Sequence, residues 1–313
     1  MSKYAEYTDG QKEAIFNMIG GKPVIDRMLT GELTARLIEP AAATSAAPTK
    51  PEIVIEPSVR SRFDRHGIRI PPKGFKAEVV AADRSFTLRR VRFNLKARLS
   101  RIVRGFPGMT FPTLEAFLAQ VQAITGQIQG DGQLAKLLRG VCIPLCLPRL
   151  QVSDYGTVLD TTFLTAVGQA YTAQFPNRAF YNNVHGALAG KVGIVPESRH
   201  QTLLERMAAG PVVGLYFPAC LQGFSIPADR EQMVDLPPWL TLSGGLDIAT
   251  ALVAYPDILA RDYQVPCLDM AALTFGSAEE SLYAYAGGDS LDVNGRYLGA
   301  IGHASGGLLA LGR

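Results

Sequence analysis

The sequence predicts an α+β fold, and three observations support this. Segments with helical periodicity and segments with strand-like alternation follow one another without a regular βαβ repeat. The sequence contains no internal repeat of fixed period. Of its 313 residues, 47% are hydrophobic, enough to bury a sizeable core. We expect a small N-terminal helical module, followed by a mixed body of helices and strands with an antiparallel C-terminal sheet.

The helical module is predicted over residues 1–38. Thr8 and Gln11 fit the capping box T-x-x-Q, which predicts a helix over about 9–19. A second short helix and a strand are expected after it. Residues 39–59 are rich in Ala, Pro, Ser and Thr, a composition typical of a linker, although their I-V-I run is compatible with a short edge strand.

Charge is divided unevenly along the chain. Residues 60–104 contain fourteen Lys and Arg and three acids, a local charge of +11, so the rest of the chain carries −8. This asymmetry indicates an anionic partner: nucleic acid, an acidic protein surface, or this chain's own acidic body. A basic strand face that simply contacts solvent is the alternative. The candidate anion-binding residues are Arg89, Arg90, Arg92, Lys96, Arg98, Arg101 and Arg104.

The secondary structure of this basic block is open from sequence alone. Residues 91–99 alternate as in a strand, whereas Leu95, Leu99, Ile102 and Val103 also fit one face of a helix. Both interpretations leave the basic side chains outside the apolar set.

The remainder is interpreted as a basic strand and helix region over 60–150 and an α+β C-terminal domain over 151–313. In the first, a buried strand is expected in the sequence VCIPLCL; in the second, Ser225 is expected to cap a helix. The C-terminal strands are expected to be separated by the Gly-rich segments Gly287-Gly288-Asp289, Asn294-Gly295 and Ser305-Gly306-Gly307.

One loop resembles a phosphate-binding motif. The segment Ser243-Gly244-Gly245-Leu246-Asp247 is similar to the S-G-G-x-D-S loop of the ATP pyrophosphatase family, in which backbone N–H groups and a helix N-terminus hold pyrophosphate. The resemblance implies phosphate binding by Ser243, Gly244, Gly245 and Asp247.

Two departures from that family favour another interpretation. Ile248 stands where the family has Ser, and Pro237-Pro238 is unfavourable in a central parallel strand. The alternative is an ordinary helix start with Ser243 as the N-cap.

Other catalytic signatures are weak. The four histidines have no metal-ligand spacing, and there is no G-x-S-x-G nucleophile motif, so we expect neither a metal nor a cofactor. The polar loop from Asn182 to His185 is the one further candidate for an enzyme site, together with Ser243 and Asp247. The sequence leaves open whether the protein is an enzyme, and it favours a non-enzymatic role.

Two segments resemble uncharacterised bacterial proteins. The opening I-G-G-K-P-V-I-D-R-M-L-T-G-E-L-T resembles the "I-G-G...L-x-G-E-L" start of proteins from candidate-phylum, Parcubacteria-like bacteria. The C-terminal third, from Pro211 to Gly302, is similar to an actinobacterial family of domain-of-unknown-function proteins. The resemblances imply a bacterial origin and supply no mechanism.

The sequence favours a non-enzymatic binding or scaffold protein whose residues 84–104 form a cationic face. The alternatives are a nucleotide- or phosphate-binding enzyme that uses the Ser243 loop, and a self-assembling structural protein whose basic block pairs with a neighbouring copy, which would make a homo-oligomer. The polar N-terminus and the absence of an apolar run of ~18 residues predict a cytoplasmic protein without membrane contact.

Overall fold

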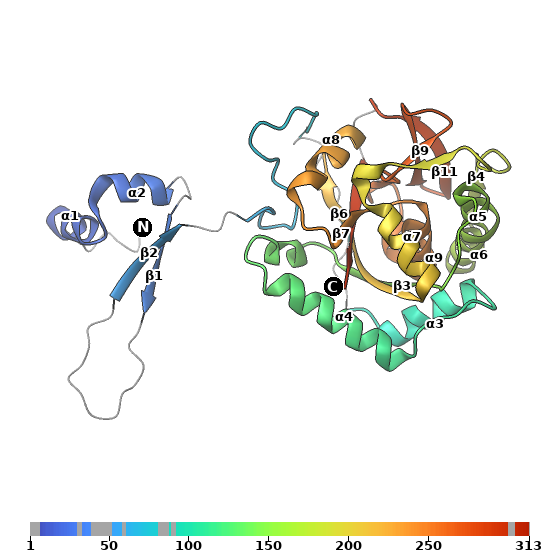
Figure 1. Cartoon of the computed structure of the whole chain (residues 1–313), viewed down its shortest axis with the longest axis horizontal. Helices are drawn as coiled ribbons and strands as arrows, with labels where there is room; N and C mark the ends of the chain where they lie inside the picture. Colours follow the sequence, from blue (N-terminus) through green and yellow to red (C-terminus); the bar gives the residue numbers. More distant parts are fainter. Residues whose placement is uncertain are drawn as a thin grey trace. The chain divides into compact units, whose positions relative to one another are not determined.

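The computed structural model describes residues 7–29, 33–38, 52–57, 61–80, 88, 92–299 and 304–312. The chain divides into two compact units, Met1–Ser61 and Arg62–Arg313 (Figure 1). No described helix is both long and apolar enough to cross a membrane.

The first unit contains two helices and a hairpin. Helix α1 (Asp9–Met18) begins with the expected capping box: the Thr8 hydroxyl accepts from the Gln11 N–H, and the Gln11 side chain accepts from the Thr8 N–H at 2.9 Å. Helix α2 (Gly21–Leu29) follows, and strands β1 (Leu33–Ile38) and β2 (Glu52–Pro57) pair antiparallel. The second strand therefore lies within the segment expected to be a linker.

The second unit is built on a mixed sheet. Its hydrogen-bonded neighbours follow the order β3, β6, β12, β8, β10, β11, β4, and β7 also pairs with β12. These strands are β3 (Ile143–Leu147), β4 (Ala179–Asn182), β6 (Val212–Gln222), β7 (Leu240–Leu242), β8 (Cys267–Asp269), β10 (Glu280–Ala286), β11 (Ser290–Tyr297) and β12 (Ala304–Leu311). Strands β5 (Val192–Ile194) and β9 (Leu273–Phe275) form a separate pair.

The α+β class is confirmed. The C-terminal strands β10 and β11 form an antiparallel hairpin, while β12 with β8 and β11 with β4 are parallel pairs. Strand β3 pairs with β6, so residues on both sides of the boundary expected near residue 150 share one sheet.

Strands β6 and β12 separate two hydrophobic cores. Along β6, Val212 and Tyr216 belong to one cluster of buried residues, whereas Val213, Leu215 and Phe217 belong to the other. The same alternation in β12 places Leu309 and Leu311 in the first cluster and Leu308 and Ala310 in the second. Both faces of these strands are therefore buried.

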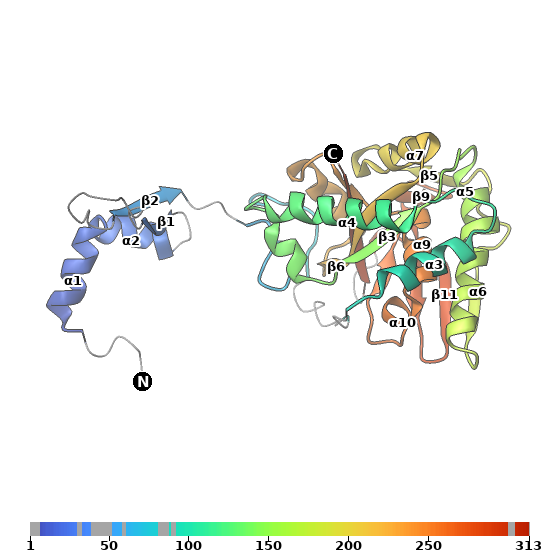
Figure 2. The same cartoon turned by 90° about the horizontal axis from the view of Figure 1, so that it is seen from below.

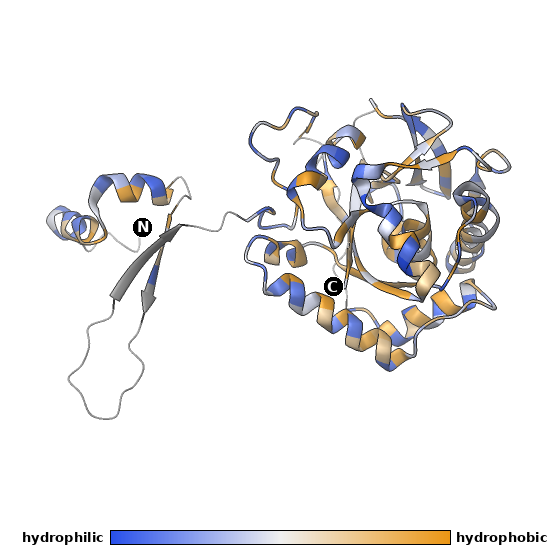
Figure 3. Ribbon diagram, in the orientation of Figure 1, coloured by the Kyte–Doolittle hydropathy of each residue, from blue (hydrophilic) through white to orange (hydrophobic). Residues whose placement is uncertain are grey.

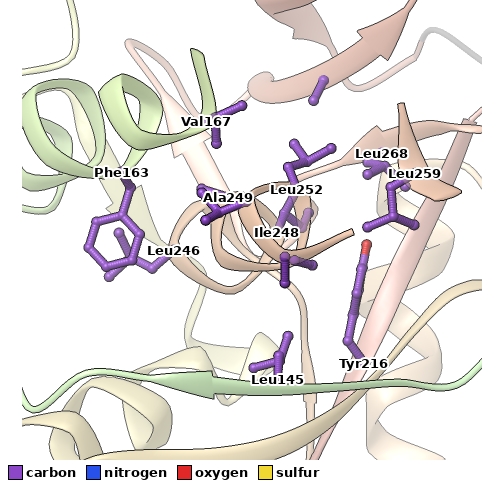
Figure 4. Packing of buried hydrophobic residues seen from close by; sticks show 14 of the residues in the cluster. Leu145, Phe163, Val167, Tyr216, Leu246, Ile248, Ala249, Leu252, Leu259 and Leu268 are labelled. Atoms are coloured by element: carbon purple, nitrogen blue, oxygen red, sulfur yellow. The ribbon is translucent and has the colours of Figure 1, made fainter. Parts of the chain in front are cut away.

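Helix α9 (Gly245–Ala254) is the centre of the first core. All ten of its residues are buried, as expected for a helix that is apolar all round. Helices α3 (Leu95–Gly105) and α6 (Thr165–Gln174) pack against it, and it packs on β3 (Figure 2). Figure 4 shows Leu246 beside the Phe163 ring within this cluster.

Helix α4 (Leu114–Gln129) covers the opposite face. It begins at an N-cap, Thr113, and its buried residues Phe117, Ile124 and Ile128 join the second core. Figure 3 shows hydrophilic and hydrophobic residues interspersed along α4, as expected for a helix with one buried side.

The remaining elements are short or peripheral. They are the 3₁₀ segments η2 (Ala135–Arg139), η4 (Pro196–Ser198) and η5 (Gln232–Asp235), the π-helical segment η3 (Leu159–Leu164), and the helices α5 (Tyr155–Val158), α7 (His200–Ala209), α8 (Ile226–Glu231) and α10 (Pro256–Leu259). Helix α8 has the expected N-cap, since the Ser225 hydroxyl accepts from the Ala228 N–H at 3.3 Å.

Two Gly-rich segments expected to separate strands lie inside them instead. Gly295 is within β11, and Gly306 and Gly307 are within β12. A Cβ atom on Gly306 would lie 2.0 Å from Asp229 Oδ2, and one on Gly307 would lie 2.2 Å from Tyr216 Cε2. The two β12 glycines therefore mark a close approach of buried side chains to the strand, and the chain does not turn there.

We predict that Gly307→Ala destabilises the protein by about 1–3 kcal/mol, because the added methyl group overpacks against the fully buried Tyr216 ring. Gly288→Ala is the control, since nothing lies within 4 Å of its Cβ position, and we expect a change within ~0.5 kcal/mol. Urea unfolding of both variants measures the difference. Equal stability of the two would contradict the close packing described here.

Candidate anion-binding surface and a buried polar network

Within the basic block, residues Leu95–Gly105 form the helix α3, so the strand interpretation of residues 91–99 is wrong from Leu95 onwards. Asn94 is the N-cap, and its Oδ1 accepts from the Ala97 N–H at 3.1 Å. Leu99 and Ile102 are buried, and they pack the helix onto both cores: Ile102 belongs to the first and Leu99 to the second. The helix thus carries its basic residues on more than one face.

Arg98 is part of the interior, contrary to the expectation that it lies outside the apolar face. Its guanidinium forms a bidentate pair with Asp257, at 2.5 and 2.7 Å, and donates to the Ala254 carbonyl at 2.8 Å. It also lies over the Tyr255 ring, 4.7 Å from the centroid. Only 13% of the Arg98 side chain is exposed. Arg98 therefore clamps α3 to the end of α9 and is not a free surface cation.

Asp257 is held as a carboxylate by this clamp. Burial alone would raise the pKa of Asp257, but the hydrogen bonds and the charge of Arg98 outweigh burial and lower it. Both carboxylate oxygens already bond Arg98, so Asp257 binds Arg101 only through a longer contact of 3.5 Å to Oδ1.

Arg101 and Arg104 line a groove of about 360 Å³ between α3 and α6. The Arg101 Nη1 atom is buried and has no hydrogen-bond partner among the described residues. Apart from these two arginines, every residue that lines the groove is uncharged. The others are Gly105, Ala166, Gln169, Ala170, Ala173, Gln174, Val253 and Pro256.

Three of the predicted residues, Arg92, Lys96 and Arg104, are exposed. None has an ion-pair partner within the described ranges. Arg89 and Arg90 lie outside the described residues. We call the cationic face of α3 the set of Arg92, which lies just before the helix, and Lys96, Arg101 and Arg104, which lie on it.

The Ser243 loop is buried, which bears on its resemblance to a phosphate loop. Ser243 and Asp247 are 0% exposed. The helix begins at Gly245 with Gly244 as its N-cap, so the expectation that Ser243 is the N-cap is wrong. The Asp247 carboxylate accepts from the Gly244 N–H at 2.9 Å and completes the first turn from inside the protein.

Tyr155 occupies the position at which a phosphate would meet the helix N-terminus. Its hydroxyl oxygen accepts from the N–H groups of Gly245 and Leu246, at 2.9 and 3.1 Å. The same hydroxyl lies 2.9 Å from Nε2 of His200, and Nδ1 of that ring lies 3.3 Å from the Leu242 carbonyl. The Leu242 carbonyl can only accept, so Nδ1 carries the proton and the Tyr155 hydroxyl donates to Nε2.

Burial keeps this imidazole neutral. It lowers the pKa of His200 to about 4, so the ring accepts the tyrosine proton without carrying a charge. The backbone amides that a phosphate loop would offer to a ligand are therefore already used within the protein.

Sequence reasoning missed a second set of buried polar groups beside β12. Asp229 is fully buried, and neither of its oxygens has a hydrogen-bond partner among the residues that the structure describes. Burial, and then the nearby Asp269, raises its pKa well above the ordinary range. Asp269 pairs with Arg296 at 2.8 Å, yet burial raises its pKa to about 6. The sequence signal for this packing was Gly306, a glycine within a strand. It faces Asp229 and is the register partner of Asp269.

The loop from Asn182 to His185 is organised by Asp160. This buried carboxylate accepts from Asn182 Nδ2 at 2.8 Å and from the Gly186 N–H at 2.7 Å, and it lies 2.9 Å from His185 Nδ1. Burial would raise the pKa of Asp160, but these hydrogen bonds lower it. The His185 side chain is 75% exposed and lines none of the grooves described here. The buried Asp160 carboxylate thus provides the hydrogen-bond partner for these polar groups of the loop.

Across the described part of the chain, no group of three His, Cys, Asp or Glu is arranged to hold a metal ion. A comparison of the chain with models of known protein families, with curated proteins and with solved structures found no match. The resemblances noted from the sequence therefore stay predictions.

We predict that Tyr155→Phe lowers the free energy of unfolding by about 2–3 kcal/mol, because it leaves the Gly245 and Leu246 N–H groups and His200 Nε2 without partners in the interior. Chemical denaturation measures the loss. Tyr263→Phe is the matched control, since the Tyr263 side chain is 61% exposed. A loss no larger than that of the control would contradict the role of this hydroxyl.

Asp247 should make stability depend on pH. Burial raises its pKa to about 7, well above the ordinary 3.8 of an aspartate side chain. The folded protein therefore holds a proton that the unfolded chain releases, and the stabilisation is complete below the unfolded pKa and lost as pH rises towards 7. The two pKa values correspond to a loss on the order of 4 kcal/mol.

Asp247→Asn should flatten the decline of the unfolding free energy between pH 4 and 8, because it removes the titrating group and keeps an oxygen that can accept from the Gly244 N–H. Asp289→Asn, which changes an exposed acid, should leave the decline as in the unmodified protein. Urea unfolding across this pH range provides the comparison. An undiminished slope in Asp247→Asn would show that Asp247 does not titrate in this range.

Proposed function

We propose that the protein is a non-enzymatic binding or scaffold protein, and that the cationic face of α3 contacts an anionic partner such as nucleic acid or an acidic protein surface. The observation that carries this proposal is the exposure of Arg92, Lys96 and Arg104 without an ion-pair partner in the described part of the chain. Unpaired cations gathered on a helix and in the segment just before it favour an anionic ligand.

The anchoring of α3 supports the proposal. Arg98 fixes the helix to α9 and α10, and Gly105 allows close packing, since a Cβ there would lie 2.7 Å from Val253 Cγ1. A partner would therefore meet basic side chains on a fixed backbone, which reduces the ordering cost of binding.

The groove beside α3 adds to this support. Arg101 and Arg104 line it, and the amide side chains of Gln169 and Gln174 can donate to phosphate or carboxylate oxygens. Among the described residues that line the groove, none is an acid that would repel an anion.

The phosphate-binding alternative at the Ser243 loop has less support, because Tyr155 and Asp247 already engage its amides. Self-assembly through the acidic body of a second copy would use the same cationic face. It is therefore an outcome of the same experiment.

We predict that the protein binds a fluorescent nucleic-acid oligonucleotide, with an affinity that falls as salt rises. On duplex DNA, the logarithmic salt slope should weaken by about 0.9 for each phosphate contact removed. The variant Lys96→Gln/Arg104→Gln should therefore bind more weakly and with a shallower slope. Fluorescence anisotropy at increasing NaCl concentrations measures both quantities.

The matched control is Arg149→Gln/Lys191→Gln, which removes two exposed cations outside the cationic face and should bind like the unmodified protein. Binding of polyglutamate without nucleic acid would favour an acidic protein partner, and salt-sensitive self-association would favour assembly. An absence of all three interactions at low salt, or an equal loss in the control, would refute the proposal.

A further inference from the structure

A second groove, of about 410 Å³, lies beside the C-terminal half of β6, which contributes Phe217, Ala219, Cys220 and Gln222 to its lining. Its basic side chains are Arg65, His66 and Arg139, and none of the described residues that line it is a carboxylate. Its partly exposed apolar residues are Ile68 and Ala219, and the buried Leu137 and Phe217 of the second hydrophobic core lie beneath them. The groove therefore combines an apolar floor with a cationic rim.

The segment that carries Arg65 and His66 is a tight turn held from both ends. The Asp64 N–H donates to the Ile68 carbonyl at 2.8 Å, and the Asp64 carboxylate accepts from the N–H groups of His66 and Ile68 at 2.7 and 3.0 Å. Gly67, at φ +80, allows the turn to close. The one acid in the turn thus stabilises its backbone.

Arg69 anchors this turn beneath the surface. It is 1% exposed, pairs with Asp235 at 2.5 Å and donates from Nε to Gln232 at 3.0 Å. Its N–H donates to the Cys220 carbonyl of β6 at 2.8 Å. The turn is consequently fixed against the strand that forms the groove floor.

The turn also contacts the segment that carries Arg139. A Cβ atom on Gly67 would lie 2.4 Å from the backbone N of Gly140, so the two loops are in direct contact. The two arginines that line the groove therefore come from segments about 70 residues apart in sequence that the fold brings together. Neither guanidinium forms an ion pair with a described residue.

From this arrangement, we propose that the groove binds a small organic phosphate, with the phosphate between Arg65 and Arg139 and the apolar or aromatic part of the ligand over Ile68 and Ala219. Two guanidinium groups match the oxygens of a phosphate, which accept paired N–H donors. The volume lies within the range typical of small-molecule sites, and an apolar lining with a few placed polar groups is typical of them.

Phenyl phosphate is the probe, titrated calorimetrically into the full chain. We expect it to bind, inorganic phosphate to bind more weakly because it lacks the apolar contact, and phenol not to bind because it lacks the charge. Arg139→Gln and Arg65→Gln should each weaken phenyl phosphate binding at least about 10-fold, as expected when a hydrogen bond to a charged group is lost. Arg149→Gln, an exposed arginine outside the groove, should have no effect.

The variant Lys96→Gln/Arg104→Gln separates this site from the cationic face of α3, and phenyl phosphate should bind it as tightly as the unmodified protein. Absence of phenyl phosphate binding would overturn the proposal. So would unchanged affinity in both Arg65→Gln and Arg139→Gln, or a loss in Lys96→Gln/Arg104→Gln equal to theirs. None of these results depends on whether the protein binds nucleic acid.

Discussion

The complete burial of α9 is the constraint on which the larger unit depends. A helix with no exposed residue cannot leave the N–H groups of its first turn to water, so partners inside the protein must satisfy them. Tyr155 accepts from two of these groups and Asp247 from the Gly244 N–H just before the helix. The tyrosine can donate its own proton only because His200 is neutral and accepts it. One buried network thus fixes the start of the helix without a net positive charge.

The other end of α9 connects this interior to the surface. Arg98 donates to the carbonyl of Ala254, the last residue of the helix, and pairs with Asp257 in α10. A cation at a helix C-terminus also interacts favourably with the helix dipole. Helix α3 is therefore positioned by the buried helix. The packing of α9 therefore determines where the exposed cations on α3 lie.

Local signals in the sequence were sufficient for several elements. The capping box at Thr8, the N-cap at Ser225 and the hairpin turn after β10 each depend on residues close together in the chain. The position of Arg98 was also accessible, because it stands three residues after Leu95 and four before Ile102. In a helix that spacing places it on the apolar face. The helix and the strand interpretations nevertheless both placed Arg98 outside the apolar set.

The candidate sites could be predicted only in part. The bond from Tyr155 to Gly245 joins residues 90 positions apart, and the Arg65 and Arg139 groove is likewise assembled from distant segments. Periodicity and spacing carry no information about such pairs. The glycines of β12 did carry a signal, since glycine inside a strand often marks a close approach, but a Gly-Gly pair after Ser305 equally fits a turn.

In the fold, some arginines of the basic block form ion pairs at the core, and other basic residues of the block are exposed to solvent. Asp235 pairs with Arg62 and Arg69, and Asp257 pairs with Arg98 and Arg101, so two acids of the body engage the arginines that face inwards or lie at the edge of the core. Burying these guanidinium groups would be costly without such partners. Arg65, Lys96 and Arg104 lie within a few residues of the paired arginines but turn to solvent, and no carboxylate in the described residues neutralises them. The same helix and turn that bury a paired arginine therefore expose an unpaired cation beside it, which concentrates positive potential at the two grooves.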